Sequence, residues 1–297
     1  FMAVNDTIKY TDYNNIRNAV IEVLGAGSAT YGYGQTPISA SVAIGNKVTV
    51  NEWSNLRYDI LNASLHQNGS YATVPSKTEG QTVAFNASTQ PVTYYSTLAA
   101  TLASNRFNVG SGQFGVATAV PKTFTSAWSV QLRTTVTANW ADANAARYFF
   151  NAGGQILISA ARAGGTSTSQ NTSWSSLLSS AGTQGIGGNN PGAGTSPTDG
   201  TNWYRTDSNY RTFYSTSASS PYGSNTYSLS ARSFASSLEI FVDLQDGHTA
   251  LGAGPDTVDG VLTISASYKY PTGTLLPISS TWLQYVPTSL TVANIGG

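Results

Sequence analysis

The amino-acid sequence predicts a mainly β protein with a small α-helical module at its N-terminus and an antiparallel β-sandwich or jelly-roll-like body. In the first third of the chain apolar residues recur at helical spacing, whereas from residue 107 onward they alternate with polar residues, which is the period of strands. No helical pattern separates the clearest strands, and this favours an antiparallel sheet over a parallel one. We therefore expect a helical docking module at 1–106 and a β-rich body at 107–297.

Residues 12–24 form the first expected helix, because their apolar residues lie on one helical face. That face consists of Tyr13, Ile16, Val20, Val23 and Leu24. Gly25 follows the last of them, at a position where a left-handed C-cap is common. The sequence therefore predicts a short amphipathic helix that ends at Gly25.

The second expected helix begins at Thr49. Thr49 and Glu52 have the spacing of a capping box, in which each side chain satisfies a backbone amide that the helix itself leaves unpaired. This helix should end near Gly69. A third helix is expected over 91–106, where a proline precedes aromatic and leucine residues at helical spacing.

The first two helices resemble each other. Residues 12–17 and 52–57 share the order acid, aromatic, polar, Asn, aliphatic, Arg. We interpret them as a duplicated unit whose copies pack as a pseudo-symmetric pair and dock onto a neighbouring subunit; the alternative is that two amphipathic helices share composition by chance. The candidate residues for helix packing and assembly are Tyr13, Ile16, Trp53 and Leu56.

The stretch RYFFNAGGQILISAAR, at 147–162, predicts a β-hairpin in the core of the body. Its aromatic residues would form one arm, Gly153 and Gly154 would permit the turn, and the apolar residues 156–158 would form the other arm. Further strands are expected at 128–137, 238–245 and 261–270, where apolar and polar residues alternate. In the second of these, the outward positions are Glu239, Phe241, Asp243 and Gln245.

A long Gly/Ser/Thr-rich stretch at 163–235 interrupts the expected strands. Residues 163–198 carry no charge, which taken alone indicates disorder, yet Trp174, Leu177 and Leu178 make one apolar helical turn. Many aromatic residues follow. We therefore expect an ordered excursion that packs on the sheet or on another subunit.

Composition limits the classes of partner. Only 9% of the residues are charged, against roughly 25% in an ordinary soluble domain, and the formal net charge is +0. Nucleic acid is therefore not expected as a partner. No run of apolar residues is long enough to span a bilayer, so membrane insertion is not expected either. The chain has no cysteine, which excludes disulfides and thiolate metal sites.

The sequence offers little for catalysis, and we expect no enzyme and no cofactor. The two histidines are interpreted as structural: His66 near a helix C-terminus, where a partly protonated imidazole suits the helix dipole, and His248 in a solvated turn. They are too few for a metal site that needs several imidazoles. A pair of glycosidase carboxylates stays open as an alternative, since such pairs need not be close in sequence.

Four aspartates surround one expected loop and could supply oxygen ligands to calcium. They are Asp243, Asp246, Asp256 and Asp259. Their spacing does not match an EF-hand, and Asp-Gly is common in ordinary turns, so a solvated turn is the alternative. We expect no metal there.

The aromatic residues that follow the uncharged stretch could stack on sugar rings. The candidate residues for glycan stacking are Trp203, Tyr204, Tyr210 and Tyr214. Sugar stacking requires exposed rings that line a groove with polar side chains beside them. The alternative is that these rings fill a core or an oligomer interface.

Four segments resemble the virion structural proteins of tailed phages, particularly contractile-tailed phages of cyanobacteria. They read MAVNDTIKYTDYNNIRN, NEWSNLRYDILNASLHQNG, RYFFNAGGQILISAAR and NTSWSSLL, and the similarity covers about residues 1–70 and 125–180. The resemblance implies a tail, baseplate, neck or fibre-attachment component of the virion, assembled in the host cytoplasm. It carries over no catalytic residue.

We therefore expect a non-enzymatic virion protein that binds itself, as a homo-oligomer, and other virion proteins. Two alternatives stay open. The first is a receptor-binding module that recognises a host surface glycan, and the second is a capsid decoration protein. Short strict repeats are missing, so an elongated fibre shaft is not expected.

Overall fold

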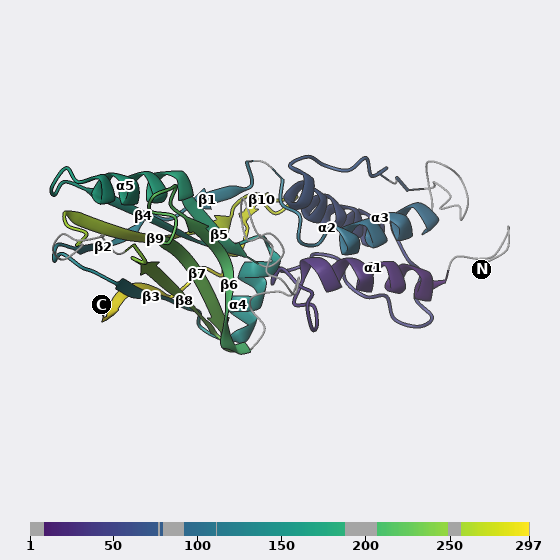
Figure 1. Cartoon of the computed structure of the whole chain (residues 1–297). Coiled ribbons are helices and arrows are strands. Elements are labelled where there is room, and N and C mark those ends of the chain that lie inside the picture. The colour runs from purple at the N-terminus through teal and green to yellow at the C-terminus, as the bar shows by residue number, and fades with distance from the viewer. Residues whose placement is uncertain are drawn as a thin grey trace. The chain divides into compact units, whose positions relative to one another are not determined.

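The computed structural model describes residues 9–76, 78–79, 92–110, 112–187, 207–248 and 257–296. Among them it contains twelve strands, which form antiparallel sheets, and five helices, the first of which lie toward the N-terminus (Figure 1). The expected fold class, mainly β with a helical N-terminal part and a β-sandwich-like body, is confirmed.

The chain separates into two compact units. The helical unit comprises 1–115, 147–153 and 271–284, and the body comprises 116–146, 154–270 and 285–297. The division therefore does not fall at one position in the sequence. Two short segments from within the expected body belong to the helical unit, because their apolar side chains, such as Ala152, Leu275 and Trp282, are part of its core.

Three helices form the frame of the helical unit: α1 (Tyr10–Leu24), α2 (Val50–Asn68) and α3 (Val92–Ser104). All three were expected from their apolar periodicity. Gly69 ends α2 in the left-handed conformation, with φ of 70°. The left-handed cap expected at Gly25 is wrong: its φ is −83°, and the first left-handed residue after α1 is Gly27, with φ of 57°.

The duplicated motif has parallel structural roles in α1 and α2. Asp12 and Glu52 each accept a hydrogen bond from the backbone N–H three residues earlier, at 2.7 and 2.8 Å. Arg17 and Arg57 each donate through Nε to a backbone carbonyl of a later loop, that of Ser39 at 3.0 Å and that of Val74 at 2.6 Å. Equivalent residues thus start each helix and tie it to a following loop.

The hairpin expected at 147–162 is wrong, because its first arm is a helix. This helix, α4 (Ala143–Asn151), begins after Asp142, whose carboxylate accepts a hydrogen bond from the Ala145 N–H at 2.8 Å. Its buried residues, Ala145, Ala146, Phe149 and Phe150, recur at helical spacing. The aromatic run was taken as a strand although the alanines before it favour a helix.

The C-terminal half of α4 holds the loop that follows α1. Arg147 donates to the Ala26 carbonyl at 3.0 Å and also to the Tyr31 carbonyl, and Asn151 donates to the Gly32 carbonyl at 3.0 Å. Gly153 then turns the chain with φ of 83°. The RYFFNAGG stretch, on which the family resemblance partly rests, therefore ties the loop after α1 to α4 within the helical unit.

Two five-stranded sheets make up the body. The first has the order β1-β9-β4-β5, with β2 also paired to β9, and the second has the order β12-β3-β8-β7-β6. The first contains β1 (Phe114–Val116), β2 (Val120–Phe124), β4 (Gln155–Ala163), β5 (Thr183–Gly187) and β9 (Val261–Pro271). The second contains β3 (Gln131–Asn139), β6 (Asp207–Ser217), β7 (Thr226–Ser233), β8 (Ser237–Gln245) and β12 (Ser289–Gly296). A two-stranded ribbon, β10 (Thr274–Leu275) with β11 (Ser280–Thr281), lies in the helical unit.

The strands expected in the body are present, but one of them starts later than expected and the Gly/Ser/Thr-rich stretch contains further elements. The strand expected at 128–137 starts at Gln131, because Val130 has φ of 69° and is 73% exposed. The described part of 163–235 contains the helix α5 (Ser169–Ala181) and the strands β5, β6 and β7. The single apolar turn expected around Trp174 is thus part of a longer helix.

Candidate binding surface

The four residues expected to pack helices and mediate assembly all lie inside the helical unit. Tyr13, Ile16, Trp53 and Leu56 are at most 4% exposed. The rings of Tyr13 and Trp53 meet edge to face, with centroids 5.3 Å apart, so the two copies of the motif are in direct contact. Side chains this buried hold the unit together and cannot themselves bind another subunit.

Of the four expected glycan-stacking residues, the two that the structure describes do not lie together. Trp203 and Tyr204 lie outside the described residues. Tyr210 packs against Phe241, with centroids 5.5 Å apart, whereas Tyr214 packs against the fully buried Tyr227 at 5.9 Å. Because Phe241 and Tyr227 lie on opposite faces of the sheet, so do Tyr210 and Tyr214.

The aspartates considered as possible calcium ligands take part in separate contacts. Asp243 accepts hydrogen bonds from Gln131 and Gln245, both at 2.9 Å, and Asp246 accepts one from Gln170. Asp259 binds residues around the start of α5. Asp256 lies outside the described residues, and the described ones contain no group of three or more side chains that could hold a metal ion.

His66 is not the partly protonated helix-end residue that the sequence suggested. Its ring is 1% exposed and stacks on the indole of Trp282, with centroids 4.3 Å apart. Burial lowers the pKa of His66 to about 3, so the ring is neutral at pH 7. His248, expected in a solvated turn, is half-buried, and its ring packs against that of Tyr222, with centroids 4.5 Å apart.

The outer face of the second sheet carries charged and aromatic side chains in direct contact with one another. In β8, Leu238, Ile240, Val242 and Leu244 are buried, and the alternate residues therefore point to the opposite face. We call this face the aromatic–arginine surface. It consists of Arg133, Tyr210, Arg232, Glu239, Phe241 and Asp243, of which Asp243 is only 7% exposed.

Register in the sheet places opposite charges directly across from each other. Arg232 in β7 lies opposite Glu239 in β8, and their side chains form an ion pair at 2.5 Å. Arg133 in β3 lies opposite Asp243, at 3.6 Å. Each ion pair is thus a cross-strand pair, the arrangement in which opposite charges stabilise a sheet.

Aromatic rings connect the two ion pairs. The guanidinium of Arg232 lies 4.5 Å from the centre of the Tyr210 ring, and that of Arg133 lies 5.6 Å from the centre of the Phe241 ring. The Tyr210 hydroxyl donates a hydrogen bond to Glu239. Burial, helped by Glu239, raises the pKa of Tyr210 to about 12, so this hydroxyl keeps its proton and stays a donor.

This combination suits protein recognition. Tyrosine, phenylalanine and arginine are enriched at the centres of protein interfaces, where rings supply area and paired charges supply orientation. The alternation of apolar and polar residues places Phe241 at an outward position of its strand. An apolar ring at such an outward position was the signal in the sequence that could have indicated this surface.

In the part of the chain that the structure describes, no helix is both long and apolar enough to cross a membrane. Comparison with protein-family models, with curated proteins and with solved structures found no match to this chain.

Proposed function

We propose that this chain is a non-enzymatic virion structural protein of a tailed phage that assembles as a homo-oligomer in the tail, baseplate, neck or fibre attachment. The resemblance of residues 1–70 and 125–180 to such proteins supports the place in the particle. The aromatic–arginine surface carries the proposal that the protein works by association. On this face two ion pairs lie beside partly exposed aromatic rings.

A second copy of the chain is the partner that this surface fits best. Its two arginines and two acids balance in charge, so two copies of the same face meet without net repulsion. In a symmetric contact an arginine of one copy can reach Glu239 of the other, while Tyr210 and Phe241 supply apolar area at the centre.

Sedimentation velocity of the full chain tests the association. We expect an oligomer at micromolar concentration, and Tyr210→Ser should weaken it about tenfold or more, since truncating a hot-spot aromatic residue at the centre of an interface costs about 2 kcal/mol or more. Tyr71→Ser is the matched control: Tyr71 is 47% exposed and Tyr210 39%, but Tyr71 lies in the helical unit.

Two results would contradict the proposal. The aromatic–arginine surface has no role in assembly if the chain stays monomeric throughout the micromolar range. The same conclusion follows if both tyrosine variants weaken the oligomer equally. If an antibody against the chain does not detect it in purified phage particles, the proposed location in the virion is contradicted. The two parts of the proposal can therefore fail separately.

A further inference from the structure

A groove in the body lies between α5 and the connection from β6 to β7. Its volume is about 470 Å³, within the range of small-molecule sites. Nine of its thirteen lining residues are serine or threonine, and none is charged. No residue of the aromatic–arginine surface lines this groove.

The α5 wall presents a row of hydroxyl groups. Ser169, Ser173, Ser176 and Ser180 line the groove, and their spacing of three or four residues puts them on one helical face. Successive members of such a row are about 5–6 Å apart, comparable with the length of one sugar unit in a linear chain. The row thus offers hydroxyls at nearly regular intervals along about three helical turns.

Several of these hydroxyls make no hydrogen bond in the part of the chain that the structure describes. Thr172 and Ser175 donate to the backbone carbonyls one turn earlier, both at 3.0 Å, which is the usual fate of such groups in a helix. The hydroxyls of Ser173, Ser176 and Ser180, by contrast, have no hydrogen-bond partner among the described residues. They are available to a ligand as both donors and acceptors.

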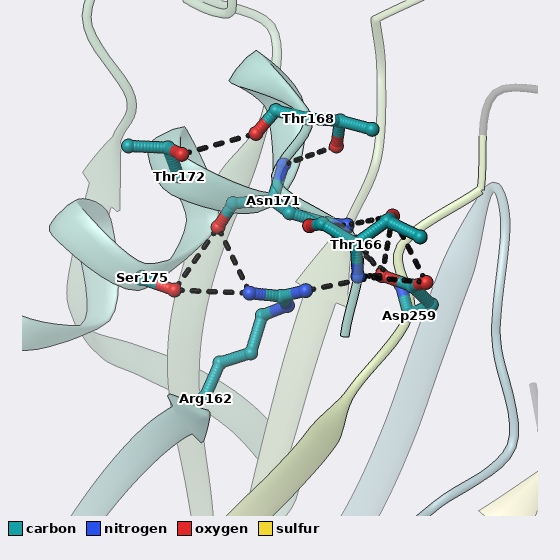
Figure 2. Close-up of polar contacts among 7 residues, drawn as sticks. All are labelled: Arg162, Thr166, Thr168, Asn171, Thr172, Ser175 and Asp259. Carbon is teal, nitrogen blue, oxygen red and sulfur yellow. Dashed lines mark hydrogen bonds and ion pairs between the residues drawn. The ribbon is translucent and has the colours of Figure 1, made fainter. Parts of the chain in front are cut away.

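A polar network fixes the start of α5 (Figure 2). The Thr168 hydroxyl caps the helix by accepting from the Asn171 N–H at 3.1 Å, and the Asn171 side chain donates to the Asp259 carboxylate. Arg162, whose side chain is 6% exposed, lies 3.2 Å from Asp259 and donates to the Asn171 carbonyl at 3.2 Å. The groove wall is therefore held in place before any ligand arrives.

The opposite wall is also braced. The Tyr222 N–H donates to the Ser219 carbonyl at 2.9 Å, and the Tyr222 ring rests against His248, with centroids 4.5 Å apart. The buried Asn225 side chain accepts from the His248 N–H at 2.9 Å and so joins this turn to the end of β8. Tyr222 thus places a fixed aromatic ring at the groove.

From these observations we infer that the groove between α5 and the β6–β7 connection binds a linear neutral oligosaccharide. Hydroxyl groups that donate and accept match sugar hydroxyls, which do the same, and the Tyr222 ring offers an apolar face to a sugar ring. The absence of charge from the lining residues favours a neutral glycan over an acidic one, because nothing there would pair with a carboxylate or sulfate.

Isothermal titration calorimetry of the full chain with maltohexaose, cellohexaose and chitohexaose tests the inference, and an oligogalacturonate serves as the acidic probe. We expect one neutral hexasaccharide to bind with a Kd below about 10 mM, and the acidic one to bind at least tenfold more weakly. Ser176→Arg, which fills the groove, and Tyr222→Ala should each weaken that binding about tenfold or more.

Ser179→Arg is the matched control. Ser179 is exposed on the same helix but does not line the groove, so this variant should bind as the wild type does. Absence of binding by all three neutral probes, equal loss in the two serine variants, or a preference for the acidic probe would overturn the inference. The oligomeric state of Ser176→Arg should stay that of the wild type, so failure here leaves the proposed assembly untouched.

Discussion

Acid should destabilise the helical unit through His66. The imidazole is enclosed between the indole of Trp282, 4.3 Å away and tilted by 18°, and the ring of Tyr33, 5.0 Å away. Desolvation by burial lowers the pKa of His66 to about 3, although an interaction with the Ala152 backbone acts in the opposite direction. A proton can therefore be added only at the expense of this packing.

The sign and size of the effect follow from the two pKa values. Because the pKa of His66 in the folded chain lies below its ordinary value of 6.5, the unfolded chain binds a proton between about pH 3 and 6.5 that the folded chain does not. Stability therefore falls as the pH falls through this window. Each pH unit costs about 1.4 kcal/mol, so a change from pH 7 to pH 5 should cost about 2 kcal/mol.

Urea unfolding followed by tryptophan fluorescence, at about pH 7 and about pH 5, measures this cost. The wild type should lose about 2 kcal/mol more than His66→Leu between the two conditions, because the variant has no group to titrate there. His248→Leu, which removes the other histidine, is the control and should lose as much as the wild type. Asp59, whose pKa is raised by burial, changes stability with pH in the opposite sense, but it is present in every variant.

Two further substitutions test local features of the helical unit. Gly153→Ala should cost about 1–3 kcal/mol more than Gly112→Ala in urea unfolding, because both glycines have positive φ but only the new Cβ at Gly153 would meet Val109, at 2.1 Å. An equal loss in both would mean that Val109 moves aside freely. Thr49→Ala should cost about 1 kcal/mol and speed hydrogen exchange in the first turn of α2, since it removes the cap; unchanged exchange would contradict the role of the capping box.

Elements that depend on neighbours in the sequence could be predicted from it. The capping box of Thr49 and Glu52 marks the start of α2 because both partners lie within four residues of each other. In the same way, the alternation in 238–245 identifies β8 and its buried apolar residues, but not the burial of Asp243, which lies at an outward position. The helix over 143–151 was missed because three consecutive aromatic residues outweighed the alanines and the Asp142 cap before them.

Tyr210 and Tyr214 were expected to act together in stacking on a sugar, and the reason that they do not lie together is a different one. In a regular strand Tyr210 and Tyr214 would point to the same face, because they are four residues apart. The pairing of β6 with β7 shifts between Thr212 and Tyr214, and this irregularity reverses the faces that follow it. Such a shift depends on the partner strand, so alternation within β6 alone gives no sign of it.

The position of charges in the body is more informative than their number. The ion pair of Arg162 with Asp259 holds the start of α5, whereas those of Arg133 with Asp243 and of Arg232 with Glu239 lie on the outer sheet face. The first pair is tied to one helix by hydrogen bonds and so fixes geometry, in keeping with the role of largely buried polar groups in specifying structure. The other two lie beside partly exposed rings, where a second protein could reach Arg133, Arg232 and Glu239. In a chain with so few charges, the uncharged hydroxyl groove and the charged aromatic face are thus chemically distinct surfaces, and a ligand suited to one has little to gain from the other.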